Sequence, residues 1–182
     1  IELVNASPTL QNITFVSNHI NGVQIGATVL ASDIWDNPDI VYYIRSDTTI
    51  PAGSTLTLSP GMIVKFTPDV SLFVNGELQV NGSVTQNVIF TSYRDDSAGG
   101  DTNNNGFSAG VVEDWGRIQF NDSSIDASTI EYTTIRYSGN DGPYSSSDYG
   151  AIVLDNASPV LHDITFTNNH YDGAELVGGA AW

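Results

Sequence analysis

The sequence predicts an all-β protein whose short strands stack as the successive coils of a solenoid, and three observations lead to this prediction. First, no stretch of the sequence shows a sustained apolar period of 3.6 residues. Second, short β-branched and aromatic segments recur between Gly, Pro, Asn and Asp. Third, the chain restates its opening near its end, since 13 of 22 residues are identical when Ile1 to Gly22 is aligned with Ile152 to Gly173. Such self-similarity is the signature of repeat architectures, in which each unit contacts only its neighbours.

The predicted strands are short and follow one another closely. In many of them apolar and polar residues alternate, as around Leu56 and Leu58 or Ile164 and Phe166, and alternation places one side chain inside and the next outside. In chain order the predicted strands are TLTL (55–58), MIVKF (62–66), SLFV (71–74), ELQV (77–80), NVIF (87–90), RIQF (117–120), TIEY (129–132), TIRY (134–137), AIVL (151–154) and DITF (163–166). Because turn formers separate these segments, we expect each strand to end at a bend.

Two Asn-Gly pairs, at 75–76 and 81–82, leave one alternative fold open. Two-residue turns of this kind favour hairpins, so an antiparallel β-sandwich is the competing prediction. Three features favour the stack instead: strands of three or four residues, their close spacing, and the return of the same Ile-Thr-Phe strand with similar flanks. Asn residues at the bends of such a stack can form hydrogen-bonded ladders.

The middle of the chain carries the most specific pattern. Residues 49–66, 71–92, 115–120 and 128–139 resemble, in this order, the right-handed parallel β-helix modules of large secreted or cell-surface bacterial repeat proteins, in the pectate-lyase-like solenoid superfamily. The resemblance covers roughly residues 40–176 and implies a right-handed parallel β-helix in a secreted or cell-surface protein. It implies no single activity, because the same coil supports enzymes, adhesins and passive stalks.

The sequence indicates one β-helix domain over residues 1–182, with an insertion at 93–114. The insertion is polar, rich in Gly and Asn and without strand alternation, so we expect a loop extruded between two strands. A shorter loop is expected at 138–150 and a bend at 31–40. Residues 152–182 restate residues 1–31 at an offset of 151 residues, which is too long for a single coil. We therefore interpret the restated block as the start of a second copy of a large module.

The charge balance excludes some classes of partner. The chain has 21 acidic and 5 basic residues, a net charge of −16. Nucleic acid is not an expected partner, because phosphate binding needs clustered Lys and Arg. Membrane insertion is not expected either, because a spanning helix needs about 20 consecutive apolar residues. There is no Cys, so neither a disulfide nor a thiolate site is possible. The acidity suits a calcium-rich extracellular setting, and solubility alone would explain it equally well.

The insertion holds the sharpest candidate site. Asp101, Asn103 and Asn105 followed by Gly106 match the opening half of a calcium loop, in which oxygens on alternate residues of a tight turn point at one cation. The site differs from an EF-hand, because Val112 stands where that loop has its bidentate Glu and no helices flank it. The predicted calcium ligands are Asp95, Asp96, Asp101, Asn103, Asn105, Glu113 and Asp114. The alternative is a solvated loop that binds nothing.

Other candidate chemistry is weaker, and we predict no catalytic residue. A lyase would need a basic residue near calcium, and Arg94 is the best candidate, although an ion pair with Asp95 or Asp96 explains it better. His19 and His170 occupy equivalent positions of the two copies and are interpreted as residues that fill the same bend. The Asp residues are too many for the sequence to single out a hydrolase pair.

The function expected from the sequence is that of a non-enzymatic, calcium-stabilised structural or adhesive module of a secreted or surface repeat protein. The expected partners are neighbouring copies of the same module, stacked end to end, because a solenoid leaves open edges at both ends. The alternative is a carbohydrate-active β-helix: a polysaccharide lyase, a glycoside hydrolase or a glycan-binding domain. Glycans are therefore a second class of expected partner.

Overall fold

The computed structural model describes residues 1–4, 6–28, 32–140 and 149–177. In this part of the chain the secondary structure consists of fifteen strands without a helix. The strands are β1 (Glu2–Leu3), β2 (Val23–Ile25), β3 (Asp33–Trp35), β4 (Val41–Ile44), β5 (Thr48–Ile50), β6 (Thr55–Leu58), β7 (Ile63–Phe66), β8 (Leu72–Val74), β9 (Glu77–Asn81), β10 (Val88–Ser92), β11 (Ile118–Phe120), β12 (Thr129–Arg136), β13 (Ile152–Asp155), β14 (Val160–Thr167) and β15 (Ala174–Val177). The described residues accordingly contain no helix that could cross a membrane.

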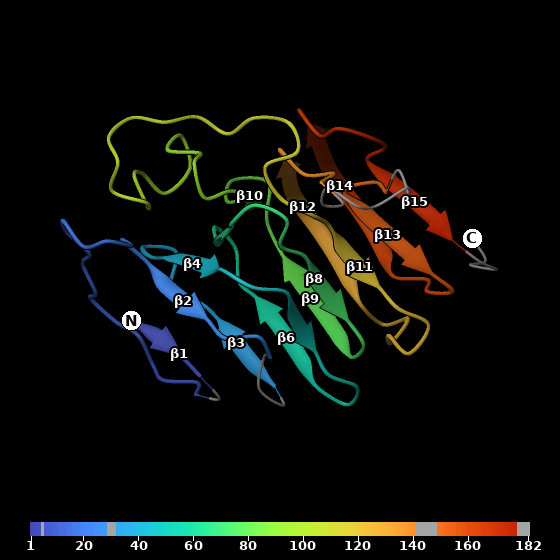
Figure 1. Cartoon of the computed structure of the whole chain (residues 1–182). Helices are drawn as coiled ribbons and strands as arrows, with labels where there is room; N and C mark the ends of the chain where they lie inside the picture. Colours follow the sequence, from blue (N-terminus) through green and yellow to red (C-terminus); the bar gives the residue numbers. More distant parts are fainter. Residues whose placement is uncertain (5, 29–31, 141–148, 178–182) are drawn as a thin grey trace.

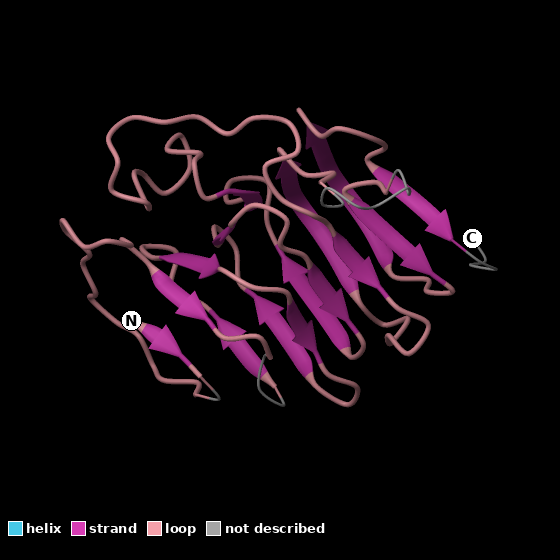
Figure 2. Ribbon diagram, in the orientation of Figure 1, coloured by secondary structure: helices cyan, strands magenta, loops and turns pink. Residues whose placement is uncertain are grey.

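The strands form parallel sheets that run along the whole molecule (Figures 1 and 2). A ten-stranded sheet has the order β1-β2-β4-β7-β10-β12-β9-β6-β3, with β14 also paired to β12, and a five-stranded sheet has the order β15-β13-β11-β8-β5. The large sheet curls at β12, because residues 129–131 pair with β9 while residues 133–135 pair with β10. We call a set of strands that pair with one another along the stack a row. Consecutive strands such as β7, β8 and β9 lie in three different rows. Each pairs with strands of the same row about one coil before and after it.

Every pairing between the described strands is parallel, so the antiparallel alternative is wrong. The Asn-Gly pairs are corners of a coil rather than hairpin turns. The backbone N–H groups of Asn75 and Gly76 both donate to the carbonyl of Ile50 in the preceding coil, at 2.9 and 3.1 Å. Gly82 donates likewise to the carbonyl of Glu131, at 3.1 Å. An Asn-Gly pair can therefore form a bend whose hydrogen bonds run along the stack. The sequence of the pair alone does not distinguish such a bend from a two-residue hairpin turn.

The core consists of columns of side chains that are in register from coil to coil. One side chain of each strand points inward and its neighbour points outward, as the alternation in the sequence predicts. The inward columns are Tyr42, Val64, Phe90 and Ile135 in the first row, Ile50, Val74, Phe120 and Leu154 in the second, and Leu58, Val80 and Ile130 in the third, all of them buried. Trp115 closes the core behind the insertion by stacking on Phe66, with ring centroids 4.3 Å apart.

Two local predictions need correction. The segment 31–40 was expected to be a bend, yet β3 lies within it and pairs with β6. This strand is stabilised by Asp33, whose carboxylate accepts a hydrogen bond from the Trp35 indole at 3.2 Å. The segments TIEY and TIRY are one strand, β12, because the chain continues around a corner at Tyr132, where φ is +43°. Of the loop expected at 138–150, residues 141–148 lie outside the described part of the chain.

Candidate functional site

No strand of the described chain falls between Ser92 at the end of β10 and Ile118 at the start of β11, where the insertion was predicted. The insertion lies over the outer side of the row formed by β4, β7, β10 and β12 and extends toward the N-terminal segment (Figure 1). Tyr43, Lys65 and Thr91 form the outward column of this row, and their exposed fractions are only 4%, 0% and 0%. An outer face is normally solvated, so these values show that the insertion covers it.

Lys65 is the centre of the covered face. Its Nζ donates to the carbonyl of Gly100 at 2.8 Å. Burial lowers the pKa of Lys65 to about 8, although the nearby carboxylates of Asp95, Asp96 and Asp101 act in the opposite direction. Three of the predicted calcium ligands therefore lie close enough to a protein cation to compensate its charge.

Asp95 fixes the start of the insertion. Its Oδ2 lies 2.6 Å from Nη2 of Arg136 and accepts a hydrogen bond from the hydroxyl of Thr91, also at 2.6 Å. Its Oδ1 accepts from the hydroxyl of Ser97 at 2.6 Å. Only 1% of Asp95 is exposed, so both carboxylate oxygens are buried and engaged by protein donors.

Asp114 fixes the end of the insertion in the same way. Its Oδ1 lies 2.6 Å from Nη1 of Arg94, and its Oδ2 accepts from the hydroxyl of Ser92 at 2.7 Å and from the backbone N–H of Val111 at 2.9 Å. The expected ion pair of Arg94 with Asp95 or Asp96 is therefore wrong in its partner. The chain reverses through the insertion, which brings Asp114 back beside β10, whereas Asp95 turns toward β12.

The segment from Asp101 to Gly106 forms a compact turn. The carboxylate of Asp101 accepts the backbone N–H groups of Asn105 and Gly106 at 3.2 and 2.9 Å, and Gly106 has a φ of +83°. A side-chain oxygen of Asn103 is buried and accepts no hydrogen bond. The same is true of Oδ1 of Asp96, whose Oδ2 accepts the backbone N–H of Ser108 at 2.6 Å.

The structure thus separates the seven predicted ligands into groups. Asp95 and Asp114 are engaged by arginines, and Asn105 is exposed. Glu113 points to the other end of the chain, with its Oε1 2.6 Å from Nδ1 of His170. Asp96, Asp101 and Asn103 remain. Among the predicted ligands, only Asp96 and Asn103 have a buried side-chain oxygen without a donor, whereas both oxygens of Asp101 accept backbone N–H groups. Within the described residues, no three Asp, Glu or His side chains converge on one point.

Sequence reasoning missed Lys65 and Arg136 as part of this site. Alternation correctly places both on the outer side of their strands, and an outer side chain is ordinarily solvated. One signal was available, because two of only five basic residues stand at outward positions of the strands on either side of β10. In this chain both cations contact the acidic insertion.

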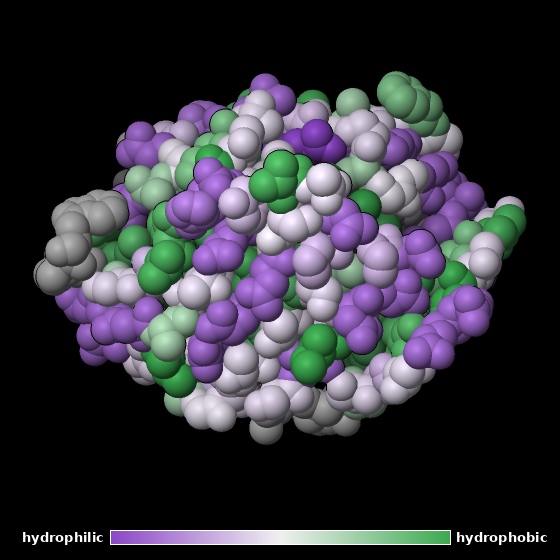
Figure 3. Space-filling view, turned by 180° about the vertical axis from the view of Figure 1, so that it is seen from behind, coloured by the Kyte–Doolittle hydropathy of each residue, from purple (hydrophilic) through white to green (hydrophobic). Residues whose placement is uncertain are grey.

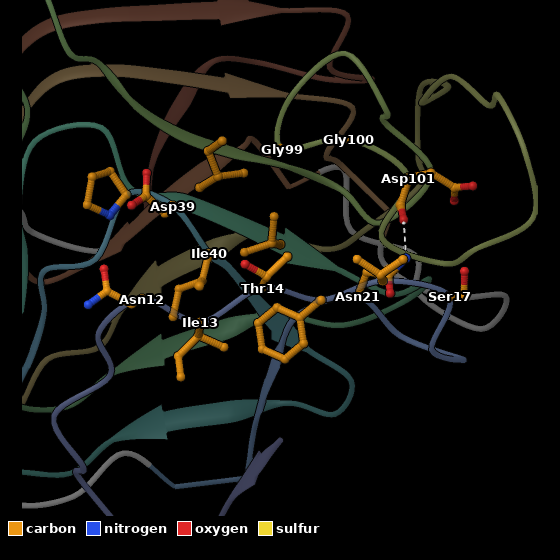
Figure 4. A pocket seen from close by; sticks show the side chains of 15 residues that line it. Asn12, Ile13, Thr14, Ser17, Asn21, Asp39, Ile40, Gly99, Gly100 and Asp101 are labelled. Carbon is orange, nitrogen blue, oxygen red and sulfur yellow. Dashed lines mark hydrogen bonds between the residues drawn. The ribbon is translucent and has the colours of Figure 1, made fainter.

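A groove lies beside the insertion, between the N-terminal segment and the beginning of β4. It has a volume of about 700 Å³, and Ile13, Phe15 and Ile40 are among its apolar lining residues (Figure 4). Gly99, Gly100 and Asp101 of the insertion form its rim. Asn21 ties the N-terminal segment to this rim, because its Nδ2 donates to the carbonyl of Asp101 at 3.1 Å and its backbone N–H donates to that of Thr102 at 2.8 Å.

The face seen from behind the view of Figure 1 has a mixed surface (Figure 3). Hydrophilic and hydrophobic residues are intermixed there, and the hydrophobic ones lie scattered between polar neighbours (Figure 3). Scattered apolar residues of this kind are normal on protein surfaces.

Comparison with known proteins adds one partial likeness. No protein-family model matches the chain, and no solved structure matches it. The chain is 31% identical over 67 residues to the protein named Protein bark beetle of Drosophila melanogaster. The likeness covers 37% of this chain and 2% of that protein, so the chain spans a very small part of its relative and the comparison shows no family.

Proposed function

We propose that the chain is a non-enzymatic structural or adhesive module, built as a right-handed parallel β-helix, of a larger secreted or cell-surface repeat protein. The observation that carries the proposal is the continuity of the stack. Three rows of parallel strands keep their register from coil to coil, and the inward columns run on to half-buried apolar residues at both ends, among them Leu10 and Phe15 at one end and Leu161 and Phe166 at the other. A stack that ends on apolar side chains is suited to continuation by further coils.

The state of the charged groups supports a structural role over a catalytic one. A glycoside hydrolase needs two carboxylates, roughly 5–10 Å apart, that are free to act on a sugar. Asp95 and Asp114 are instead held by Arg136 and Arg94. A lyase needs a basic group that can reach its substrate. Lys65 is fully buried, and the candidate base Arg94 is held in an ion pair with Asp114. These groups hold the insertion on the stack.

We propose in addition that calcium binds to the insertion through Asp96, Asp101 and Asn103. Calcium prefers oxygen ligands, and the buried acceptors of Asp96 and Asn103 that lack a donor are oxygens of this kind. A bound cation would satisfy these two oxygens. Asp95 and Asp114 would act as structural counterions of Arg136 and Arg94, rather than as ligands.

Thermal melts test the calcium proposal. The unfolding midpoint should rise in calcium relative to chelator, because a ligand that binds only the folded state adds about 2.7 kcal/mol at a hundredfold excess over its Kd. Asp101→Asn should reduce this rise. Asp122→Asn is the matched control, since Asp122 is exposed and outside the insertion. Equal midpoints of the unaltered chain in calcium and chelator would contradict the proposal.

A screen of glycans and polyuronates tests the non-enzymatic role. We expect no turnover of any substrate, with or without calcium. Cleavage of a polysaccharide would instead favour the carbohydrate-active alternative, and binding without cleavage would favour a glycan-binding domain.

A further inference from the structure

The two copies of the repeated block have the same coil geometry at opposite ends of the molecule. β1 pairs with β2 through Leu3 and Ile25, and β13 pairs with β15 through Leu154 and Leu176, which is the same register after the shift of 151 residues. The backbone turns also coincide. Asn12 and its counterpart Asp163 have φ values of +53° and +52°, and Ser17 and its counterpart Asn168 have +54° and +55°.

The two copies contact the stack through opposite sides. The C-terminal copy lies on the coil before it, because β14 pairs with β12 over seven residues from Val160 to Thr167. Within the described chain β14 has no strand on its other side, so Phe166 is only half-buried. The N-terminal copy instead supports the coil after it, because β2 pairs with β4. The same type of coil therefore accepts a neighbour on either side.

The N-terminal copy fits its place less well than the C-terminal copy. Residues 6–22 contain no strand, whereas the equivalent residues of the C-terminal copy include the eight-residue β14. The groove of about 700 Å³ lies between this segment and residues 38–41 (Figure 4). A second groove of about 310 Å³ is lined by Leu10 and Asp36 among others. Ile13 and Phe15, which line the larger groove, are therefore only half-buried.

We propose that the C-terminal coil of one molecule replaces the N-terminal coil of a second copy, so that molecules join head to tail. Exchange of an equivalent element between protomers is a low-cost route to association. Here the element that enters already has the strand that residues 6–22 lack, and its open strand edge is a template for pairing. The contact is heterologous, so it does not close and gives a linear chain with a period of 151 residues. This inference rests on the proposed stacking module and names its partner.

Phe15 and Phe166 provide a matched pair of variants, because they occupy the same place in the two copies and are both half-buried. Sedimentation velocity over a concentration range should show that the unaltered chain associates. Phe166→Asp should weaken association by about tenfold or more, since it places a charge on the donated side. Phe15→Asp should strengthen association, because it loosens the coil that is displaced. The double variant should associate more strongly than Phe166→Asp and more weakly than Phe15→Asp, because the two substitutions act on different steps of the exchange.

Thermal melts of each variant confirm that its core remains folded. Equal weakening by Phe15→Asp and Phe166→Asp would overturn the exchange, because it would indicate plain stacking of intact ends. A Phe15→Asp variant that is monomeric at every concentration would also overturn it, while leaving the proposed scaffold role intact. Polysaccharide turnover would overturn the scaffold role and not the exchange.

Discussion

Lys65 shows how a single residue links the insertion to the stack. It is an outward side chain of a central strand, yet it is fully buried because the insertion covers it. Its ammonium group is compensated by the carbonyl of Gly100 and by the negative charges of Asp95, Asp96 and Asp101. An acidic insertion on a chain with so few cations is thus placed by the cations that it covers.

The pH dependence of stability should report on Lys65. Its pKa falls from 10.5 in the unfolded chain to about 8 in the fold, so above pH 8 the unfolded state binds more protons. Stability should therefore rise with pH between about 8 and 10.5, by about 2 kcal/mol from pH 7 to pH 9.5. Urea unfolding at the two pH values measures this gain. Lys65→Met should abolish it, and a gain that persists in this variant would assign it to other groups.

Asp95 should contribute to stability with or without calcium. Asp95→Asn leaves the guanidinium of Arg136 without its countercharge, and removing one partner of a buried ion pair costs about 3 kcal/mol. Urea unfolding in chelator measures the loss, with Asp122→Asn as the exposed control. A loss that appears only in calcium would make Asp95 a ligand, as the sequence alone suggested.

At this scale the sequence identified the acidic residues of the insertion and not their partners. Asp95, Asp96, Asp101 and Asp114 can be recognised from spacing and local charge. The partner of Asp114, Arg94, is near in sequence, whereas Arg136 and Lys65, which interact with the other three, come from distant strands. The face that an insertion covers is decided by tertiary packing, which local spacing does not encode.

At the scale of the element, the insertion is positioned by a close approach of its backbone. Gly99, with a φ of +65°, lies so near β4 that an added Cβ would come within 2.4 Å of Cγ2 of Val41. Gly100 has a similar φ of +73°, but an added Cβ there would meet nothing within 4 Å. The two glycines therefore have the same backbone requirement and different surroundings.

This difference gives a controlled test of the contact between the insertion and β4. Gly100→Ala should cost about 1 kcal/mol, because of its positive φ alone. Gly99→Ala should cost about 1–3 kcal/mol more, because the backbone of the insertion must move away from Val41. Thermal unfolding measures both, and proteolysis within residues 93–114 should be faster in Gly99→Ala. Equal effects of the two substitutions would mean that the insertion does not lie on β4.

Alternation identified β6, β9 and β11, but not the three-residue strands β2 and β5, which alternate as well. β6, β9 and β11 each place an apolar side chain inward at every second position, and burial follows this pattern. β4 has no such pattern, because all four of its residues are buried, two by the core and two on the outer side. The run Val-Tyr-Tyr-Ile was therefore not recognised as a strand. β3 was missed for a different reason. Asp is common in turns, but the carboxylate of Asp33 accepts hydrogen bonds from Ile34 and Trp35 of the same strand.

At the scale of the whole molecule, the repeat was the most informative part of the sequence. It predicts a stack, and the parallel register of all described strands agrees with that class of architecture. The repeat did not predict that one copy forms a regular strand while the other does not. Within the described residues β14 pairs with β12, whereas residues 9–16 pair with no strand.

The distance between two spin labels at the ends of the five-stranded sheet measures whether the coils stack in the order described. The chain has no Cys, so labels can be placed without other changes, at Thr49 and Glu175. The registered positions Thr49, Phe73, Gln119, Val153 and Glu175 belong to successive strands of the five-stranded sheet. Four strand spacings of about 4.8 Å place the two backbones about 19 Å apart. The stack requires a narrow distance distribution near that value, and a broad distribution or a separation well beyond it would contradict it.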